Sequence, residues 1–149
     1  MAHTGDTYLL SVDYGRSVKD GVKAGRYEGN INPDIVFAAN FPTEREGTAE
    51  VEMELIHFDR DISTEEVLRE LDRMGYRPAD IYELLALGEK YRGVQLGVTV
   101  VALGSVWFDG KADYVPFISF GNERRRLGLC PKYTWWDKEG RERFAAVKK

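Results

Sequence analysis

The chain has 149 residues, of which 43% are hydrophobic and 31% charged, and its formal net charge is −4. This length suits one domain, and no apolar run is long enough to cross a bilayer. One cysteine and two histidines exclude an intramolecular disulfide and supply too few ligands for a zinc site, so we expect no metal and no cofactor.

The first segments of the chain predict strands around a short helix. Residues 7–14, TYLLSVDY, are rich in aromatic and β-branched side chains and indicate a strand. Residues 17–27 predict a short helix weakened by two glycines. Residues 48–59 alternate, with apolar side chains at odd positions and glutamates at 50, 52 and 54. This pattern predicts a half-buried strand that pairs antiparallel with residues 7–14. The N-terminus lacks the features of a secretory signal, and the sequence does not predict a localisation.

Two helices are predicted next. In STEEVLRELDRM, residues 63–74, Ser63 and Glu66 have the spacing of a capping box. In RPADIYELLALGEKY, residues 77–91, we expect Pro78 in the first turn and acidic residues, Asp80 and Glu83 among them, on an exposed face. Two helices joined by a tight turn also occur in helix-turn-helix DNA-binding proteins, but phosphate repels an acidic second helix.

The last third predicts strands joined by irregular segments. Residues 94–108 are the most apolar stretch and predict a central strand. Residues 113–120 predict a shorter strand, with Pro116 placing its middle at an edge or a bulge. Residues 121–143 show no lasting periodicity, which indicates an irregular segment or short hairpins, and residues 143–149 predict a final strand.

Signatures of catalysis are missing from the sequence. It contains no glycine-rich phosphate loop, no G-x-S-x-G motif and no pair of histidines at ligand spacing. His57 lies on the apolar face of its strand, and Asp59 and Asp61 suit capping of the next helix better than cation binding. Cys130 is expected to be a partly exposed thiol. We therefore expect that the protein is not an enzyme.

Basic and aromatic residues are concentrated near the C-terminus. Residues 110–149 hold ten basic and five acidic residues, and nine of the eighteen aromatic residues lie at or beyond position 107. The arginines at 124–126, followed by Tyr133, Trp135 and Trp136, are of the types enriched at binding hot spots. Single-stranded nucleic acid or another polyanion is an alternative ligand. Another interpretation is that the tryptophans complete the core while the arginines neutralise an acidic scaffold, and we expect this burial for one of the two adjacent tryptophans.

Four segments resemble the variable proteins of diversity-generating retroelements, in particular the archaeal type. They are GYRPADIYELLALG (75–88), VVALGSVW (100–107), YVPF (114–117) and RFAAVKK (143–149). The resemblance extends roughly from residue 51 to the end of the chain. It implies an α+β, C-type lectin-like fold in one domain, residues 1–149, with two helices, a small antiparallel sheet and long irregular connections. It also implies a fixed scaffold whose surface is diversified by error-prone copying at adenines.

The resemblance places a non-catalytic ligand-binding region at about residues 117–142. Its partner would be a protein or a cell-surface ligand, with nucleic acid less favoured. We assign Leu127, Leu129, Trp136 and Phe144 to the scaffold. The expected ligand-binding residues are Ser119, Phe120, Asn122, Glu123, Arg124, Arg126, Lys132, Tyr133, Trp135, Asp137, Glu139, Arg141 and Glu142.

Two departures from related proteins limit this expectation. Formylglycine-generating enzymes of the same broad fold use paired cysteines, whereas Cys130 stands alone. Animal lectins of the fold often bind sugar through calcium, but Asp137 and Glu139 do not complete a calcium ligand set. We therefore expect neither that activity nor calcium-dependent sugar binding.

Overall fold

The structure is a computed structural model that describes residues 2–27, 41–91, 97–121 and 124–149. Within these ranges the chain is a mixed α+β protein with three helices and a mostly antiparallel sheet. The helices are α1 (Val18–Gly25), α2 (Thr64–Arg73) and α3 (Ile81–Lys90). The strands are β1 (Ala2–Asp13), β2 (Thr48–Phe58), β3 (Ile62–Ser63), β4 (Tyr76–Pro78), β5 (Thr99–Val101), β6 (Trp107–Phe108), β7 (Asp113–Gly121), β8 (Arg124–Pro131), β9 (Trp135–Trp136) and β10 (Glu142–Lys148).

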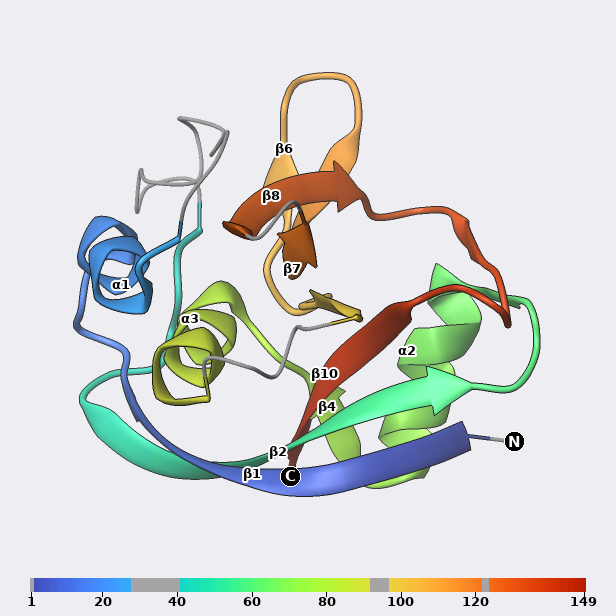
Figure 1. Cartoon of the computed structure of the whole chain (residues 1–149), viewed down its shortest axis with the longest axis horizontal. Helices are drawn as coiled ribbons and strands as arrows, with labels where there is room; N and C mark the ends of the chain where they lie inside the picture. Colours follow the sequence, from blue (N-terminus) through green and yellow to red (C-terminus); the bar gives the residue numbers. More distant parts are fainter. Residues whose placement is uncertain (1, 28–40, 92–96, 122–123) are drawn as a thin grey trace.

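Eight of these strands form one sheet (Figure 1). Its order is β1-β2-β10-β5-β7-β6, with β4 also paired to β10 and β8 also paired to β7. The pair β10–β5 is parallel and the other pairs are antiparallel. The short strands β3 and β9 pair separately. The expectation of two helices and a small antiparallel sheet is therefore too simple, because the described chain has three helices and a larger, mixed sheet.

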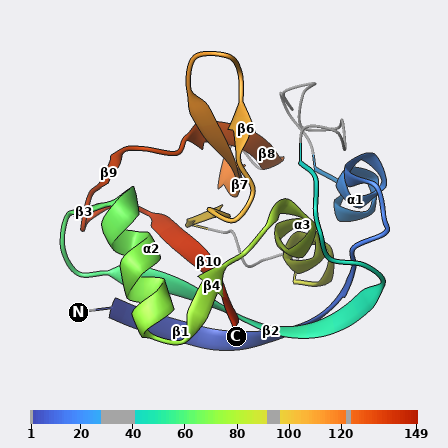
Figure 2. The ribbon, with the colours of Figure 1, turned by 180° about the vertical axis from the view of Figure 1, so that it is seen from behind.

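Each face of the sheet carries its own hydrophobic core. Leu55 belongs to a cluster that includes residues of α1 and α3, whereas the next residue, Ile56, belongs to a cluster that includes residues of α2. Ala145 and Ala146 of β10 divide in the same way. Successive strand residues point to opposite faces, so the sheet is covered on both. In both ribbon views α2 lies apart from the α1–α3 pair (Figures 1 and 2).

The double covering corrects the prediction for residues 48–59. The expected antiparallel pairing of β1 with β2 is confirmed. The first part of β2 is half-buried as predicted, with Glu50 and Glu52 exposed and Met53 buried. Its last residues are not, because Ile56 and Phe58 are buried on the face that the glutamates occupy earlier. The alternation ends where α2 begins to cover that face.

All three predicted helices form, the short one at residues 17–27 as α1, but the helix predicted at residues 77–91 begins later than expected. The capping box of Ser63 and Glu66 at the start of α2 is confirmed. Pro78 is the last residue of β4, and Asp80 caps α3 in a second capping box with Glu83. None of the helices in the described ranges is long and apolar enough to span a membrane.

The apolar stretch 94–108 is not one continuous strand. Its described part contains β5, which lies between β10 and β7 and has a fully buried Val100, and the separate strand β6. Residues 94–96 lie outside the described ranges.

Pro116 pairs with Leu129 of β8 on one side, but on the other side it falls between the ends of β5 and β6, so the middle of β7 is locally an edge on that side, in agreement with the prediction. The carbonyl of Pro116 accepts from the amide of Ala102. A strand residue directs its nitrogen and carbonyl toward the same neighbour, so the proline nitrogen also faces this side, just beyond the end of β5. The missing N–H therefore removes no ladder hydrogen bond to β8.

The segment after residue 121 is more regular than predicted. Eight residues form β8, which pairs with β7 in unbroken register from Gly121↔Arg124 to Tyr114↔Pro131. Leu127 and Leu129 lie on one face of β8, as in an alternating strand. The three consecutive arginines at 124–126 interrupt this pattern in the sequence, so the strand was not predicted. The predicted final strand is confirmed as β10, which is paired with three other strands.

Candidate ligand-binding face

A row of polar side chains crosses four strands of the sheet. Glu142 of β10 lies opposite Thr99 of β5. Ser119 of β7 lies opposite Thr99 on one side and opposite Arg126 of β8 on the other. Residues directly opposite each other point to the same face, so these four form one row, called the polar row below. Arg126 is exposed and the other three are half-buried.

The adjoining row toward the interior is apolar and supports the polar row. It runs from Phe144 through Val101 and Phe117 to Gly128. Phe144 and Val101 are buried, and the half-buried ring of Phe117 lies against Gly128. A Cβ atom at position 128 would be 2.7 Å from this ring, so glycine allows the close approach.

Cys130 is a half-buried free thiol that lies further along the same face of β8. Burial, with a smaller contribution from the negative charge of Glu142, raises the pKa of the thiol to about 12. A thiol is reactive as the thiolate, so this environment disfavours the reactive form of Cys130. One carboxylate oxygen of Glu142, Oε2, is enclosed without a hydrogen-bond partner in the described part of the chain.

The segment 132–137, called the aromatic loop below, carries two exposed rings. Tyr133 is 56% exposed and Trp135 is 70% exposed, whereas Trp136 is only 7% exposed. The Lys132 ammonium lies 5.0 Å from the centroid of the Tyr133 ring. The prediction that one of the adjacent tryptophans is buried is confirmed.

The inner side of the aromatic loop is fixed to the start of α2. The fully buried hydroxyl of Thr64 donates to the carbonyl of Lys132 and accepts from Nε1 of Trp136 at 3.0 Å. The Trp136 ring packs edge-on against Phe144, with 5.2 Å between centroids, and Trp135 pairs with Ser63 between β9 and β3. The exposed rings therefore project from an anchored backbone.

Sequence reasoning missed Phe108, which is 61% exposed. Phe108 pairs with Asp113 of β7, whose carbonyl accepts from the amide of Lys132 on the opposite side. Phe108 and the start of the aromatic loop therefore lie on opposite sides of β7, each next to Asp113. The signal is present in the sequence, because Phe108 precedes Asp109-Gly110, a dipeptide typical of hairpin turns.

The described members of the expected ligand-binding set lie in the polar row, the aromatic loop and the turn before β10. The exposed ones are Arg126, Tyr133, Trp135, Asp137, Glu139 and Arg141, and the half-buried ones are Ser119, Lys132 and Glu142. Asn122 and Glu123 and the side chains of Phe120 and Arg124 lie outside the described part. Of the residues assigned to the scaffold, Leu127, Trp136 and Phe144 are buried, and Leu129 packs half-buried at the margin of the core.

Asp59 and Asp61 precede the cap of α2 without providing it, since Ser63 is the N-cap. Asp61 accepts from the amide of Lys138 and so holds the turn before β10. His57 is partly covered, as expected, and its Nδ1 lies 3.1 Å from a guanidinium nitrogen of Arg143. Among the described residues, no group of three or more His, Cys, Asp or Glu side chains is placed to hold a metal ion.

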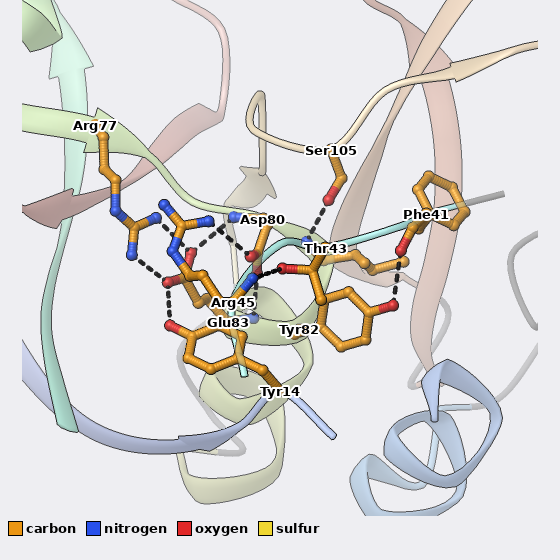
Figure 3. A network of polar contacts seen from close by, with 10 residues as sticks. Tyr14, Phe41, Thr43, Arg45, Arg77, Asp80, Tyr82, Glu83 and Ser105 are labelled. Atoms are coloured by element: carbon orange, nitrogen blue, oxygen red, sulfur yellow. Dashed lines mark hydrogen bonds and ion pairs between the residues drawn. The ribbon is translucent and has the colours of Figure 1, made fainter. Parts of the chain in front are cut away.

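A second polar cluster lies buried at the start of α3 (Figure 3). Both carboxylate oxygens of Glu83 accept from the Arg77 guanidinium, at 2.9 and 2.5 Å, and Oε2 also accepts from the Tyr14 hydroxyl at 2.6 Å. Asp80 accepts from the Glu83 amide at 2.9 Å and lies 3.6 Å from the exposed guanidinium of Arg45. The prediction that Asp80 and Glu83 are exposed is wrong, because both are buried, and Arg77 of β4 and Tyr14, which directly follows β1, bind the Glu83 carboxylate.

The two carboxylates of this cluster have shifted pKa values of opposite sign. Burial and the charge of Glu83 raise the pKa of Asp80 to about 6. Burial alone would raise the pKa of Glu83 as well, but the hydrogen bonds from Arg77 and Tyr14 outweigh it and lower the pKa. Such a contrast also occurs between catalytic acids and bases. Here both carboxylates are buried and form the capping box of α3, so the cluster holds the start of this helix.

Comparison of the chain with protein-family models, with curated proteins and with solved structures finds no match. The polar row and the aromatic loop must therefore be interpreted from their chemistry.

Proposed function

We propose that the protein is a non-catalytic recognition protein with a C-type lectin-like fold, and that its ligand binds across the polar row and the aromatic loop. The observation that carries this proposal is the separation of roles within the aromatic loop. Trp136 and the Thr64 hydrogen bonds hold its backbone, while Tyr133 and Trp135 are exposed. Rigid aromatic anchors beside adaptable polar groups are typical of binding surfaces such as antibody loops.

The arrangement of the strands supports the proposed fold. The first and last strands, β1 and β10, lie on either side of β2, and the later strands β7 and β8 lie toward the other end of the sheet. This agrees with the implied plan of neighbouring terminal strands and a ligand-binding face formed by later segments.

The partner we favour is a folded protein or a cell-surface molecule, recognised by exposed rings and mixed charges. The exposed or half-buried residues of the face carry both signs, with Arg126 and Lys132 against Asp137 and Glu142. A mixed surface with aromatic anchors suits a protein epitope better than a uniform polyanion.

Single-stranded nucleic acid is the second candidate, but several basic side chains of the C-terminal region already bind other groups of the protein. Lys148 and Lys149 form ion pairs with Glu52 and Asp72. Arg143 contacts His57, and Arg125 binds backbone carbonyls of two helices. Titration of a labelled oligothymidine tests this candidate. We expect no tight binding, whereas affinity that falls steeply between about 50 and 200 mM salt would favour a nucleic-acid function.

We further propose that the face is diversified by a retroelement, as the sequence resemblance implies. The DNA around the coding sequence tests this. We expect an imperfect copy of the 3′ coding segment, differing where the copy has adenine, beside a reverse-transcriptase gene. A complete locus without either would refute the proposal.

The binding role is tested separately with a displayed library. Positions 119, 126, 133, 135 and 142 are randomised, and the folded members are selected on purified lysozyme and serum albumin. A matched library randomises exposed positions of β2 and α2, namely 50, 52, 65, 69 and 72. We expect specific binders from the first library in excess of the second. Equal yields would refute a dedicated binding face.

A further inference from the structure

The guanidinium of Arg125 binds the C-terminal ends of two helices at once. Nη1 donates to the carbonyl of Gly25, the last residue of α1. Nη2 donates to the carbonyl of Gly88 in the last turn of α3. Carbonyls in a last helical turn lack intrahelical partners and form the negative end of the helix dipole. A planar, two-pronged cation suits this position.

Tyr27 completes the seat for this guanidinium. The Arg125 Cζ atom lies 4.8 Å from the centroid of the Tyr27 ring, which is only 8% exposed. The same ring lies against Gly25 and Gly88, where an added Cβ atom would overlap Tyr27. The two helical glycines therefore have a packing role, since they admit the ring on which Arg125 stacks.

The neighbouring arginine has a different environment. Arg125 pairs with Phe120, whereas Arg126 pairs with Ser119 and belongs to the polar row. The side chain of Arg126 is exposed and makes no ion pair or hydrogen bond with the described chain, while Arg125 is partly buried against α1 and α3. Alternation along β8 thus directs successive arginines to opposite faces.

We infer that Arg125 is a positioning residue that fixes the β7–β8 hairpin, and with it Ser119 and Arg126 of the polar row, against the α1–α3 pair. Ile118 and Leu127 of the hairpin also pack in the core shared with α3, but apolar packing is not directional. The two hydrogen bonds and the ring supply direction. The inference rests on the proposed function only in treating the polar row as a ligand contact. The positioning of the hairpin by Arg125 does not depend on a ligand.

The test measures the position of the hairpin with no ligand present. Nitroxide labels are attached through Lys23→Cys on α1 and Arg126→Cys on β8, in a chain that also carries Cys130→Ala, and pulsed electron paramagnetic resonance gives the distance distribution. We expect one narrow distribution. Arg125→Met, which keeps the length but removes the donors, should shift and widen it. Arg125→Lys, with a single point donor, should give an intermediate width.

Two further variants separate positioning from general destabilisation. Gly88→Ala keeps Arg125 in the chain but should widen the distribution, because the added Cβ atom would displace Tyr27 and lie 3.0 Å from Nη2 of Arg125. Arg141→Met removes an exposed arginine and should change nothing. The inference is overturned if folded Arg125→Met gives the unaltered distribution, or, should that variant not fold, if Arg125→Lys and Gly88→Ala both do. If Arg125→Met widens the distribution but the displayed library of the polar row and aromatic loop gives no excess of specific binders, only the proposed function is refuted.

Discussion

At the scale of single residues, neighbours in the sequence have opposite roles because strand backbones alternate. Trp135 and Trp136 are 70% and 7% exposed, and Arg125 and Arg126 divide in the same way. The composition of the segment shows that these pairs are unusual, but it does not show which member of each pair is buried. Only the direction of each side chain separates the member that stabilises the fold from the member available for contact.

The tryptophan pair gives the first prediction. Trp136→Ala removes the ring packed on Phe144 and the bond to Thr64, so we expect a loss of about 3–5 kcal/mol in the free energy of unfolding. Trp135→Ala should change it by less than about 0.5 kcal/mol. Urea denaturation of the two variants measures both, and equal losses would show that the exposed ring is also structural.

Asp80 gives a prediction about pH. The pKa of Asp80 is raised to about 6 in the folded protein, above its ordinary value of 3.8, so the folded state binds this proton more tightly than the unfolded state. The contribution of Asp80 to stability therefore falls as pH rises from about 4 to about 6. Asp80→Asn keeps an oxygen that can cap α3 but cannot titrate.

The stability of the wild type relative to Asp80→Asn should accordingly increase by on the order of 2 kcal/mol between pH 7 and pH 4. The comparison cancels the titration of carboxylates that do not interact with Asp80, whereas Glu83 interacts with it directly, so the measured difference belongs to the Asp80–Glu83 pair. Denaturation curves across this range measure the difference. A difference that is constant with pH, or that grows toward neutral pH, would contradict the assignment.

At the scale of elements, α2 organises a segment that lies far from it in the sequence. Its first residue, Thr64, binds the carbonyl of Lys132 and the indole of Trp136. The preceding residue, Ser63, both caps the helix and pairs with Trp135. The start of one helix thus fixes the aromatic loop.

Thr64→Val tests this link, because valine has nearly the same shape but cannot hydrogen-bond. Both buried partners would lose a bond, so we expect a loss of about 1–3 kcal/mol in the free energy of unfolding. Faster amide exchange in residues 132–137, measured by mass spectrometry, should accompany it. Thr134→Val, at an exposed position in the same loop, is the matched control. Unchanged exchange in Thr64→Val would contradict the anchoring role.

Features set by local sequence could be predicted, whereas features set by distant contacts could not. The capping box at Ser63 and the pairing of β1 with β2 follow from spacing and alternation, and both are confirmed. Pro116 is compatible with a paired strand only because β5 ends opposite its nitrogen. The burial of Glu83 likewise depends on Tyr14, which comes from another element.

The site shows the same division. Exposure of Tyr133 and Trp135 and burial of Trp136 agree with the alternation expected in an extended segment. The polar row requires the register of four strands, and no local pattern in the sequence supplies it. Thr99 was missed for this reason, whereas the exposure of Phe108 has a local signal in the Asp109-Gly110 turn that follows it.

At the scale of the whole molecule, two cores on opposite faces of one sheet carry the stability. The α1–α3 pair covers one face and α2 covers the other, while the polar row and the aromatic loop add exposed side chains at one end. A chain built in this way should tolerate exchange of those exposed residues, because their burial contributes little to folding.

One measurement tests this division of roles most directly. A single variant combines Arg126→Ala, Tyr133→Ala, Trp135→Ala and Arg141→Ala, and its free energy of unfolding is compared with that of Leu127→Ala, a buried position on the same strand as Arg126. We predict a change of less than about 1 kcal/mol for the fourfold variant and a loss of about 2–5 kcal/mol for Leu127→Ala. A loss of several kcal/mol in the fourfold variant would contradict the account, since these side chains would then belong to the fold.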